Sequence, residues 1–405
     1  MTDDIKFISL GCRLNALEAE KIKEMLTKAG CERAIIVNTC TVTGEAERQS
    51  KQAIRKLARE NPDMPLFVTG CAATRAPEDF TALAGVTKVV VNKDKMDISA
   101  YKVEERKAQS EGNEVTTVPL LSTLQSLSKG LVQIQNGCNH ACAYCIVSRL
   151  RGRNVSFPYE HISDNARALA ENGYGEIVLT GVDIAGYQDL SGLCKKLLAD
   201  IPALRRLRLS SLDPGVDLRP IADIMNNDPR MLSHMHLSMQ SGSDTILACM
   251  GRRHNAQIVR DLVHYADRVT FSWDLICGFP GETPELFEET CALIKELKPI
   301  RLHAFPFSPR PGTPAATMPG QVDKAESKRR VSVAIELARE NMLEFMKTQI
   351  GRTVSVLVEK NNLGRDAHDI PVRIGGNAIP PRSIIDVKLT GIEQGKELCF
   401  IAVCD

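Results

Sequence analysis

Three cysteines in the segment GCNHACAYC have the spacing C-x-x-x-C-x-x-C, at Cys138, Cys142 and Cys145. Three thiolates on one loop can hold three irons of a 4Fe–4S cluster and leave the fourth iron open to another ligand. A zinc site is the alternative, with His140 or a remote cysteine as its fourth ligand. Zinc loops favour paired C-x-x-C units, so this triple favours the iron–sulfur cluster.

A second set of three cysteines is spread through the amino-terminal region. Cys12, Cys40 and Cys71 each follow a predicted strand, in SLGC, IVNTC and FVTGC. The carboxyl ends of parallel strands converge at one edge of a sheet, so these thiols can meet and hold a second cluster with an open iron. Taken alone, each could equally be a small buried apolar residue. Packing is the expectation for the cysteines without ligand spacing, Cys31, Cys194, Cys249, Cys277, Cys291, Cys399 and Cys404.

The amino-terminal region must position the second triple, and it alternates short apolar runs with amphipathic stretches, which indicates βαβ order. The expected strands cover residues 5–11, 33–40, 66–71 and 88–92, and the expected helices cover 14–28 and 45–60. We therefore predict an α/β protein whose residues 1–105 form an open parallel sheet with helices on its faces. A polar stretch of weak periodicity over residues 106–128 is interpreted as a linker.

Six further strand patterns separated by helix-length segments follow the linker. They cover residues 131–135, 176–181, 204–211, 233–239, 271–281 and 300–308, and a charged helix is expected over 322–348. Six βα units predict a partial (βα)6 TIM-like barrel over residues 129–348, with reactive groups at the carboxyl ends of the strands. Short strands with Gly and Pro between them predict a small β-barrel over residues 349–405.

The composition is that of an ordinary globular protein, with 43% hydrophobic and 25% charged residues. The net charge of +1 gives no overall attraction to a polyanion, so a nucleic-acid site must be a local patch. No apolar run is long enough for a membrane helix, and the start MTDDIKFISLGC lacks the order of a secretory signal. We expect a cytoplasmic protein with reduced thiols and no membrane partner.

With both triples in view, the chain resembles the radical-SAM methylthiotransferase family over essentially its full length. The resemblance rests on SLGCRLN, NTC, VTGCAA, the cysteine loop followed by RGR, MQSGSD with MGRRH, DLICGFPGET and FPFSPRPGTPA. NTCTVT followed by RQSKQAIRK is similar to the branch that modifies N6-threonylcarbamoyladenosine in tRNA. The implied activity adds a methylthio group to C2 of that base at adenosine 37, next to the anticodon.

Two enzymatic alternatives keep the chemistry and change the substrate to N6-isopentenyladenosine in tRNA or an aspartate of a ribosomal protein. An alternative from another class is a non-catalytic iron–sulfur protein that binds RNA. The resemblance implies that tRNA, a flavodoxin- or ferredoxin-type electron donor and a sulfur donor are partners. It also implies that the central domain is the radical-SAM core and that residues 349–405 form a TRAM-like RNA-binding barrel, although seven Lys or Arg balance seven Asp or Glu from Gly351 onward.

The resemblance assigns the six cysteines to two [4Fe–4S] clusters. Cys138, Cys142 and Cys145 would hold the cluster on which S-adenosylmethionine (SAM) is cleaved to a deoxyadenosyl radical. The auxiliary cluster would present methylated sulfur from Cys12, Cys40 and Cys71. Residues implied to contact SAM are Tyr144, Thr180, Gly181, Ser210, Ser211 and Gly278. Ordinary turn chemistry is the alternative for the Gly and Ser positions.

Local basic clusters are the candidate contacts to tRNA phosphates. Arg149, Arg151 and Arg153 beside the cysteine loop are favoured, because the substrate must approach there. A solvated helix face is the alternative for every basic cluster. Further candidates are Lys51, Arg55, Lys56, Arg252, Arg253, Lys328, Arg329, Arg330 and, in the terminal barrel, Arg352, Lys360, Arg365, Arg373 and Arg382. His234, His236 and His303 fall on strand patterns and are expected to be interior groups, and no histidine is assigned a catalytic role.

Overall fold

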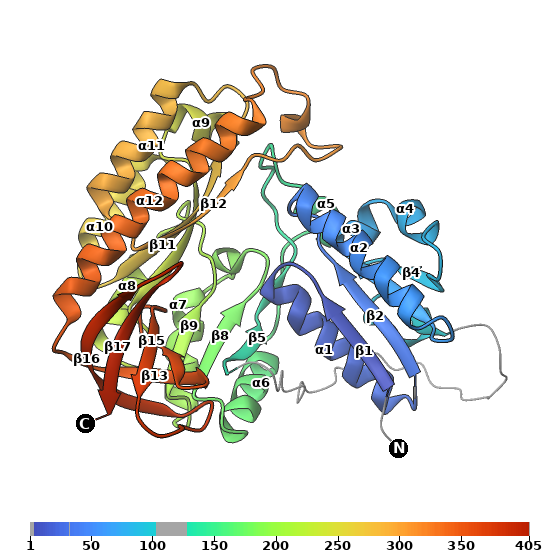
Figure 1. Ribbon diagram of the computed structural model, residues 1–405, viewed down its shortest axis with the longest axis horizontal. Coiled ribbons are helices and arrows are strands. Elements are labelled where there is room, and N and C mark those ends of the chain that lie inside the picture. Colours follow the sequence, from blue (N-terminus) through green and yellow to red (C-terminus); the bar gives the residue numbers. More distant parts are fainter. Residues whose placement is uncertain (1–3, 32, 103–127, 405) are drawn as a thin grey trace. The chain divides into compact units, whose positions relative to one another are not determined.

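The computed structural model describes residues 4–31, 33–102 and 128–404 (Figure 1). The chain forms two compact units. The N-terminal unit comprises Met1–Leu124 and Ile146–Arg153, and the C-terminal unit comprises Gln125–Cys145 and Asn154–Asp405. The linker predicted for residues 106–128 lies outside the described residues except for Ser128. Each unit is described by itself below.

The N-terminal unit is built on a four-stranded sheet in the order β1-β2-β3-β4, with every neighbouring pair parallel. Its strands are β1 (Asp4–Ser9), β2 (Arg33–Thr39), β3 (Leu66–Gly70) and β4 (Lys88–Val90). Its helices are α1 (Arg13–Lys28), α2 (Gly44–Glu60), α3 (Cys71–Arg75), α4 (Pro77–Thr81), the 3₁₀ helix η1 (Ile98–Tyr101) and α5 (Val147–Arg151). The predicted open parallel sheet is confirmed.

Alternation along the central strands gives this sheet two apolar faces. Ile35 and Val37 of β2 pack in one cluster with α2 and α4, whereas Ile36 packs in another with α1. Every residue of β3 is buried, as expected for a parallel strand covered on both sides. The sheet is therefore a rigid base for the loops at its carboxyl edge.

The C-terminal unit begins with six parallel strands. The strands β5 (Gly130–Gln133), β8 (Glu176–Thr180) and β9 (Arg206–Leu209) form one sheet, and β10 (His234–Gln240), β11 (Thr270–Cys277) and β12 (Arg301–Pro306) form another. Two isolated parallel bridges, Leu207 to Met231 and Leu212 to Leu237, join the sheets. A short antiparallel pair, β6 (Gln135–Asn136) and β7 (Val155–Ser156), follows β5. The six strands confirm the predicted partial TIM-like barrel.

Helices cover the outer side of these strands (Figure 1). They are α6 (Tyr159–Glu171), α7 (Leu190–Asp200), α8 (Arg219–Asn227), α9 (Asp244–Cys249), α10 (Ala256–Tyr265), α11 (Pro284–Leu297) and α12 (Lys324–Gln349), with the 3₁₀ helices η2 (Ile184–Gly186) and η3 (Pro314–Ala316). Trp273, Leu275 and Cys277 of β11 lie in the main apolar core with these helices. Because strand side chains alternate, Ser272 and Asp274 face the inside of the barrel.

The chain ends in a closed five-stranded barrel in the order β13-β14-β15-β17-β16. Its strands are β13 (Thr353–Lys360), β14 (Leu363–Arg365), β15 (Pro371–Gly375), β16 (Ile384–Gln394) and β17 (Leu398–Cys404). The predicted barrel is confirmed, but β14 was not predicted, because three residues are too short for a periodic pattern. The turn before it has positive φ at Asn361 and Asn362, a conformation that asparagine tolerates in tight hairpins.

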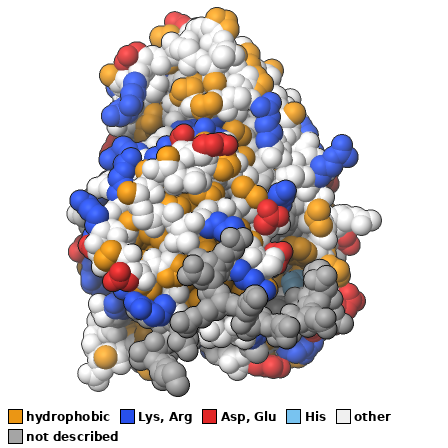
Figure 2. All heavy atoms as spheres, turned by 90° about the vertical axis from the view of Figure 1, so that its right-hand side faces the viewer, with side chains coloured by type: hydrophobic (Ala, Val, Ile, Leu, Met, Phe, Trp, Pro, Cys, Tyr) orange, Lys and Arg blue, Asp and Glu red, His pale blue; other side chains and the backbone are white. Residues whose placement is uncertain are grey.

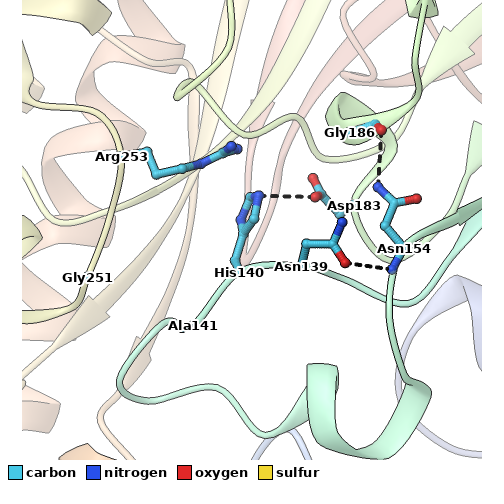
Figure 3. A pocket seen from close by; sticks show the side chains of 8 residues that line it. All are labelled: Asn139, His140, Ala141, Asn154, Asp183, Gly186, Gly251 and Arg253. Atoms are coloured by element: carbon cyan, nitrogen blue, oxygen red, sulfur yellow. Dashed lines mark hydrogen bonds and ion pairs between the residues drawn. The ribbon is translucent and has the colours of Figure 1, made fainter.

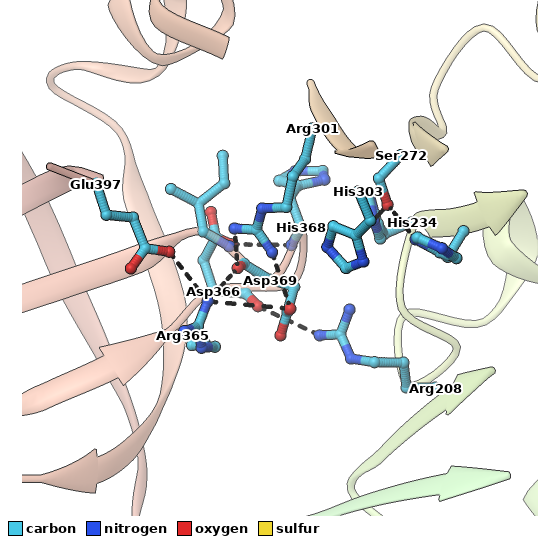
Figure 4. A network of polar contacts seen from close by, with 12 residues as sticks. Arg208, His234, Ser272, Arg301, His303, Arg365, Asp366, His368, Asp369 and Glu397 are labelled. Atoms are coloured by element: carbon cyan, nitrogen blue, oxygen red, sulfur yellow. Dashed lines mark hydrogen bonds and ion pairs between the residues drawn. The ribbon is translucent and has the colours of Figure 1, made fainter. Parts of the chain in front are cut away.

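The β14–β15 connection fills the amino end of the (βα)6 barrel with polar groups (Figure 4). Asp369 forms ion pairs with Lys129 at 2.5 Å and Arg301 at 3.2 Å, and His368 Nδ1 lies 2.9 Å from Thr270 Oγ1. Arg208 bonds Glu176 at 2.6 Å. With its amino end occupied in this way, the barrel can take a ligand at its carboxyl end. Within the described residues, no helix combines the length and apolar character needed to cross a bilayer.

Candidate functional site

The first cysteine triple lies at one edge of the N-terminal sheet. Cys12 precedes α1, Cys40 directly follows β2, and Cys71 directly follows β3 as the first residue of α3. These three strands are neighbours and run parallel, so their carboxyl ends meet. The approach is close, since a Cβ atom at Gly11 would lie 2.5 Å from Cys40 Sγ. Gly11 has a φ of +101°, so both its backbone and its lack of a side chain admit the Cys40 thiol.

The three thiols influence one another electrostatically. Burial, together with Cys12 and Cys71, raises the pKa of Cys40 to about 11, although a bond from the Val42 N–H opposes the shift. Burial raises the pKa of Cys12, and Cys71 adds to it. Protonated thiols are therefore favoured until a metal displaces the protons. Three convergent thiols, all free, are a donor set that fits an iron–sulfur cluster.

A buried ionic cluster stands behind these thiols. Arg151 of α5 lies 2.8 Å from Glu18 of α1 and also donates to Asn15 Oδ1 at 2.8 Å. Lys95 lies 2.6 Å from Glu18 on its other side. The positive charge of Arg151 lowers the pKa of both Cys12 and Cys40, against the larger effect of burial. Arg151 and Lys95 thus favour negative charge on the cysteines.

The second cysteine triple lies on the loop after β6 in the C-terminal unit. Two backbone hydrogen bonds fix the middle of this loop. Ala143 N donates to Met250 O at 2.9 Å, and Ala315 N donates to Ala143 O at 2.9 Å. Tyr144 packs on an apolar cluster whose buried members are Ala143, Ile246, Met250, Phe279 and Ala315. The loop is therefore held at the carboxyl end of the barrel strands, close to the turns that follow β10 and β11.

The Cys138 thiol of this loop also resists ionisation. Burial raises the pKa of Cys138 to about 11, with Asp183, Cys145 and Cys142 adding to the effect and the His140 N–H opposing it. Arg252 Nη1 lies 3.6 Å from Cys142 Sγ and contributes a positive charge. The three sulfurs with nearby N–H and guanidinium donors again fit a cluster that carries negative charge. Both ring nitrogens of His140, on the same loop, face carboxylates.

One of those carboxylates, that of Asp183, lines a pocket that the sequence did not reveal (Figure 3). His140 Nε2 lies 3.2 Å from Asp183 Oδ2, and His140 Nδ1 lies 3.2 Å from Asp213 Oδ2. Arg252 and Arg253 also reach Asp213, at 3.2 and 3.7 Å. Burial would raise the pKa of Asp213, but Arg252 and the Gly215 N–H outweigh it and lower that pKa. The cavity holds about 400 Å³ and is lined by Asn139, His140, Ala141, Asn154, Asp183, Gly186, Gly251 and Arg253.

The residues expected to contact SAM occupy the carboxyl ends of barrel strands. Thr180 ends β8 and is buried, and Gly181 follows it, where a Cβ would lie 2.8 Å from the Gln135 carbonyl oxygen. Ser210 and Ser211 follow β9. Gly278 follows β11 with a φ of +78°, and a Cβ there would clash with Ser327 of α12. Packing alone thus explains both glycines, and their contact with SAM stays a prediction.

Several residues expected to bind tRNA phosphates are instead committed to internal ion pairs. The side chains of Arg151, Arg252 and Arg330 are 3, 5 and 4% exposed and pair with Glu18, Asp213 and Glu282. The expectation is wrong for these three, because each neutralises a buried carboxylate. Arg149, Arg153 and Arg253 remain exposed. Figure 2 shows Lys and Arg side chains spread over one face with Asp and Glu among them, so phosphate contacts there must be scattered.

Of the three histidines that were expected to be interior groups, one, His303, is exposed. His234 is buried and bonds Thr270 and Ser272, each at 2.8 Å, as expected for an interior group. His236 is mostly buried. The side chain of His303 is 48% exposed, because β12 is the last strand of its sheet and the barrel is open beside it.

Two family models match this chain. Residues 132–294 match the Radical SAM superfamily, and residues 4–92 match Uncharacterized protein family UPF0004. The first contains the loop with Cys138, and the second contains Cys12, Cys40 and Cys71. The boundaries of the two matches thus separate the two cysteine triples.

Relatives of named activity align over nearly the whole chain. The threonylcarbamoyladenosine tRNA methylthiotransferase MtaB of Rickettsia prowazekii is 37% identical over 98% of this chain and 97% of its own length. The MtaB protein of Bacillus subtilis is 32% identical over 88% of this chain and 85% of its own length. The tRNA-2-methylthio-N(6)-dimethylallyladenosine synthase of Mannheimia succiniciproducens is 28% identical over 97% of this chain and 91% of its own length.

A solved structure supports the fold. The radical S-adenosylmethionine methyltransferase TsrM of Kitasatospora setae superposes with a TM-score of 0.60 over 78% of this chain and 77% of its own, at 15% identity. At that identity the likeness concerns the fold and not the reaction. Sequence identity of 37% over 98% of the chain is the stronger finding. This chain belongs to the radical-SAM tRNA methylthiotransferase family.

Proposed function

We propose that this enzyme transfers a methylthio group to C2 of N6-threonylcarbamoyladenosine at position 37 of tRNA. The observation that carries the proposal is the 37% identity to an MtaB protein over nearly the full chain, combined with two convergent cysteine triples. The MtaB relatives also match better than the dimethylallyladenosine synthase does. The cofactors proposed are two [4Fe–4S] clusters and SAM.

Each triple would hold one cluster. Cys138, Cys142 and Cys145 would bind the cluster that carries SAM, and the N-terminal triple would bind the auxiliary cluster. When bound, these groups supply a deoxyadenosyl radical and a methylated sulfur, which a C2–H bond requires because it has neither an acidic proton nor a polarised leaving group. The Gly and Ser positions after β8, β9 and β11 would seat SAM.

Residues of the chain itself supply positive charge near the sulfurs and exclude water from the loop. Arg252 links Cys142 to Asp213, and the His140 N–H bonds Cys138 at 3.4 Å, so both polar groups stabilise negative charge on sulfur. The apolar cluster around Phe279 and Tyr144 excludes water from one side of the loop. Exclusion of water protects a radical from side reactions.

The proposed division of labour follows the segments predicted from sequence. Residues 1–105 would be the methylthiotransferase domain that carries the auxiliary cluster, residues 106–128 a linker, residues 129–348 the radical-SAM core, and residues 349–405 a TRAM-like barrel that binds RNA. Arg149, Arg153 and Arg253 are the exposed cations near the cysteine loops that would meet tRNA phosphates. A flavodoxin- or ferredoxin-type protein would supply electrons, a sulfur donor would rebuild the auxiliary cluster, and the reaction would take place in the cytoplasm.

Mass spectrometry of tRNA nucleosides tests the proposal. In cells that lack this gene, we expect the methylthio form of threonylcarbamoyladenosine to disappear and the unmodified form to accumulate, and return of the gene should restore the first. Loss of methylthio-isopentenyladenosine instead would identify N6-isopentenyladenosine in tRNA as the substrate. An unchanged nucleoside profile would contradict a tRNA substrate, and peptide mass spectrometry of ribosomal proteins would then test the aspartate alternative.

A further inference from the structure

We propose that the inner face of β10, β11 and β12 binds the modified base itself, with Asp274 and His303 receiving the polar N6 substituent, His236 holding Asp274 in place and Phe305 stacking on the ring. This assignment rests on the proposed function and deepens it. It names the residues that distinguish a threonylcarbamoyl group, which offers a carboxylate, a hydroxyl and a urea carbonyl, from an apolar substituent at the same nitrogen.

The three polar residues form one constellation. His236 Nε2 lies 2.9 Å from Asp274 Oδ1, and His303 Nδ1 lies 3.7 Å from the same oxygen. The two imidazole rings have centroids 4.9 Å apart. Ser211 donates to the other carboxylate oxygen of Asp274 at 3.5 Å. Imidazoles beside a carboxylate are well suited to donate hydrogen bonds to oxygen atoms of a ligand.

A line of hydrogen bonds fixes His236 of this constellation from behind, and Figure 4 shows its members Ser272, His234 and His368. His236 Nδ1 bonds Ser272 Oγ at 2.9 Å, and Ser272 in turn bonds His234 at 2.8 Å. His234 bonds Thr270 at 2.8 Å, and Thr270 bonds His368 of the terminal barrel at 2.9 Å. Because both ring nitrogens of His236 are engaged, its orientation is set before a ligand arrives. We call the surface formed by His236, Asp274, His303 and Phe305 the binding wall. Because its side chains are already ordered, it loses less entropy on binding.

The wall lies next to the predicted radical site. Asp274 pairs with His303 and Ile276 pairs with Phe305 in the parallel register of β11 and β12. Ile276 packs on the cluster that contains Tyr144, which directly precedes Cys145. Asp274 is therefore one alternate strand position, roughly 7 Å along β11, from Ile276, which packs on the same cluster as the cysteine loop. In adenine, C2 and the C6 atom that bears N6 flank the same ring nitrogen, so the group that binds the N6 substituent must lie this close to the reacting carbon.

Phe305 supplies the remaining contact. It shares the face of His303 by alternation along β12, and its side chain is 45% exposed. Trp273 and Phe279, by contrast, are fully buried. An exposed aromatic ring on the inner face of an open barrel is the arrangement that enzymes use to stack a base taken out of its helix.

An apolar N6 substituent fits this wall poorly. A dimethylallyl group placed against Asp274 and His303 would remove water from two polar groups and offer no hydrogen bond in return. Sites built to hydrogen-bond a ligand reject analogues that lack the bonding groups far more strongly than apolar pockets reject extra polar atoms. The wall therefore favours the threonylcarbamoyl form.

The test compares two anticodon stem-loop RNAs, one with threonylcarbamoyladenosine and one with dimethylallyladenosine, as substrates of the full-length enzyme reconstituted with both clusters. The variants are His303→Leu, Asp274→Asn and Phe305→Leu, and the matched control is His264→Leu, an exposed histidine on α10. The measurement is kcat/KM for methylthiolation of each RNA. Release of deoxyadenosine without RNA reports how much of each variant is folded and loaded.

For His303→Leu and Asp274→Asn we expect kcat/KM on the threonylcarbamoyl RNA to fall about 10- to 100-fold, and the preference between the two RNAs to move toward the dimethylallyl form. Phe305→Leu should weaken both RNAs alike, by about 10-fold, and His264→Leu should change neither. An unchanged preference in both polar variants overturns the inference while the proposed function stands. A wild-type enzyme that methylthiolates only the dimethylallyl RNA overturns the proposed function itself.

Discussion

Arg151 Nη1 lies 2.8 Å from Glu18 Oε1, and both side chains are almost fully buried in the N-terminal unit. Burial opposes the ionised state of each, but their mutual attraction and hydrogen bonds, with Lys95 beside Glu18, lower the pKa of Glu18 and raise that of Arg151. Arg151 follows the cysteine loop of the C-terminal unit in sequence, yet it belongs to the N-terminal unit. The residue predicted to contact RNA thus supports the auxiliary cysteines.

Arg151→Met should destabilise the N-terminal unit by about 3–5 kcal/mol, because it leaves a buried carboxylate with one cation instead of two. It also removes a positive charge that favours thiolates at Cys12 and Cys40, so iron retention at the auxiliary site should fall. Thermal unfolding and iron analysis check both effects. Arg149→Met, on the exposed side of α5, is the control, and equal losses in the two variants would contradict the role given to Arg151.

The sequence was sufficient for the strands and for the convergence of Cys12, Cys40 and Cys71, because both follow from patterns along the strands, whereas the role of the cysteines as cluster ligands stays a prediction. Alternating apolar residues predicted each strand of the (βα)6 barrel, and the position of Cys12, Cys40 and Cys71 after strands predicted that they meet. The Arg151–Glu18 pair could not be predicted, since 133 positions separate the two residues. An arginine among neighbouring basic residues is expected to be exposed unless its acidic partner is known.

The pocket around His140 was missed for the same reason. Asp183 and Asp213 sit in turns after β8 and β9, and nothing local marks them as partners of a histidine on the cysteine loop. The converse holds for His303, whose strand pattern predicted burial. The openness of the barrel beside β12 is a property of the assembled fold, so the exposure of His303 and Phe305 was not readable from alternation alone.

Gly278→Ala should destabilise the C-terminal unit for two separable reasons. Its φ of +78° costs an alanine about 1 kcal/mol, and the new methyl group clashes with Ser327, adding about 1–3 kcal/mol. Gly173→Ala, in the same unit and with a φ of +81° and open space around it, isolates the first term. Denaturant unfolding of both variants gives the difference. If they lose the same stability, packing against α12 is not the reason for glycine at Gly278.

Stability at low pH should depend on Glu176. Burial would raise its pKa, but Arg208, Lys129 and Arg206 outweigh it and lower the pKa to about 2, from an ordinary value of 4.5. A carboxyl whose pKa is lowered on folding stabilises the folded state above the unfolded pKa and loses that contribution as pH falls toward the folded one. The shift corresponds to on the order of 3 kcal/mol, lost between about pH 4.5 and 2. Denaturant unfolding of Glu176→Gln should show a flatter pH dependence in that window, and a curve parallel to the wild type would contradict the assignment.

Single substitutions in the two cysteine triples should separate two activities. Cys138→Ala removes a ligand from the loop beside the barrel mouth, so SAM cleavage and methylthiolation should both be lost. Cys40→Ala leaves that loop intact, so deoxyadenosine should still form while methylthiolation of RNA is lost and iron content falls by about half. Chromatography of deoxyadenosine, iron analysis and RNA mass spectrometry supply the three readouts.

Cys249→Ala, an exposed cysteine on α9, is the control for thiol loss and should retain both activities. Methylthiolation by Cys40→Ala would show that the thiol after β2 is not needed to present sulfur, and would contradict the division of labour between the triples. Loss of SAM cleavage in the same variant would contradict it in another way, because the N-terminal triple would then be needed for radical formation. Retained cleavage with lost transfer is expected because the two triples lie in units with separate cores, so that removal of one ligand set leaves the packing around the other unchanged.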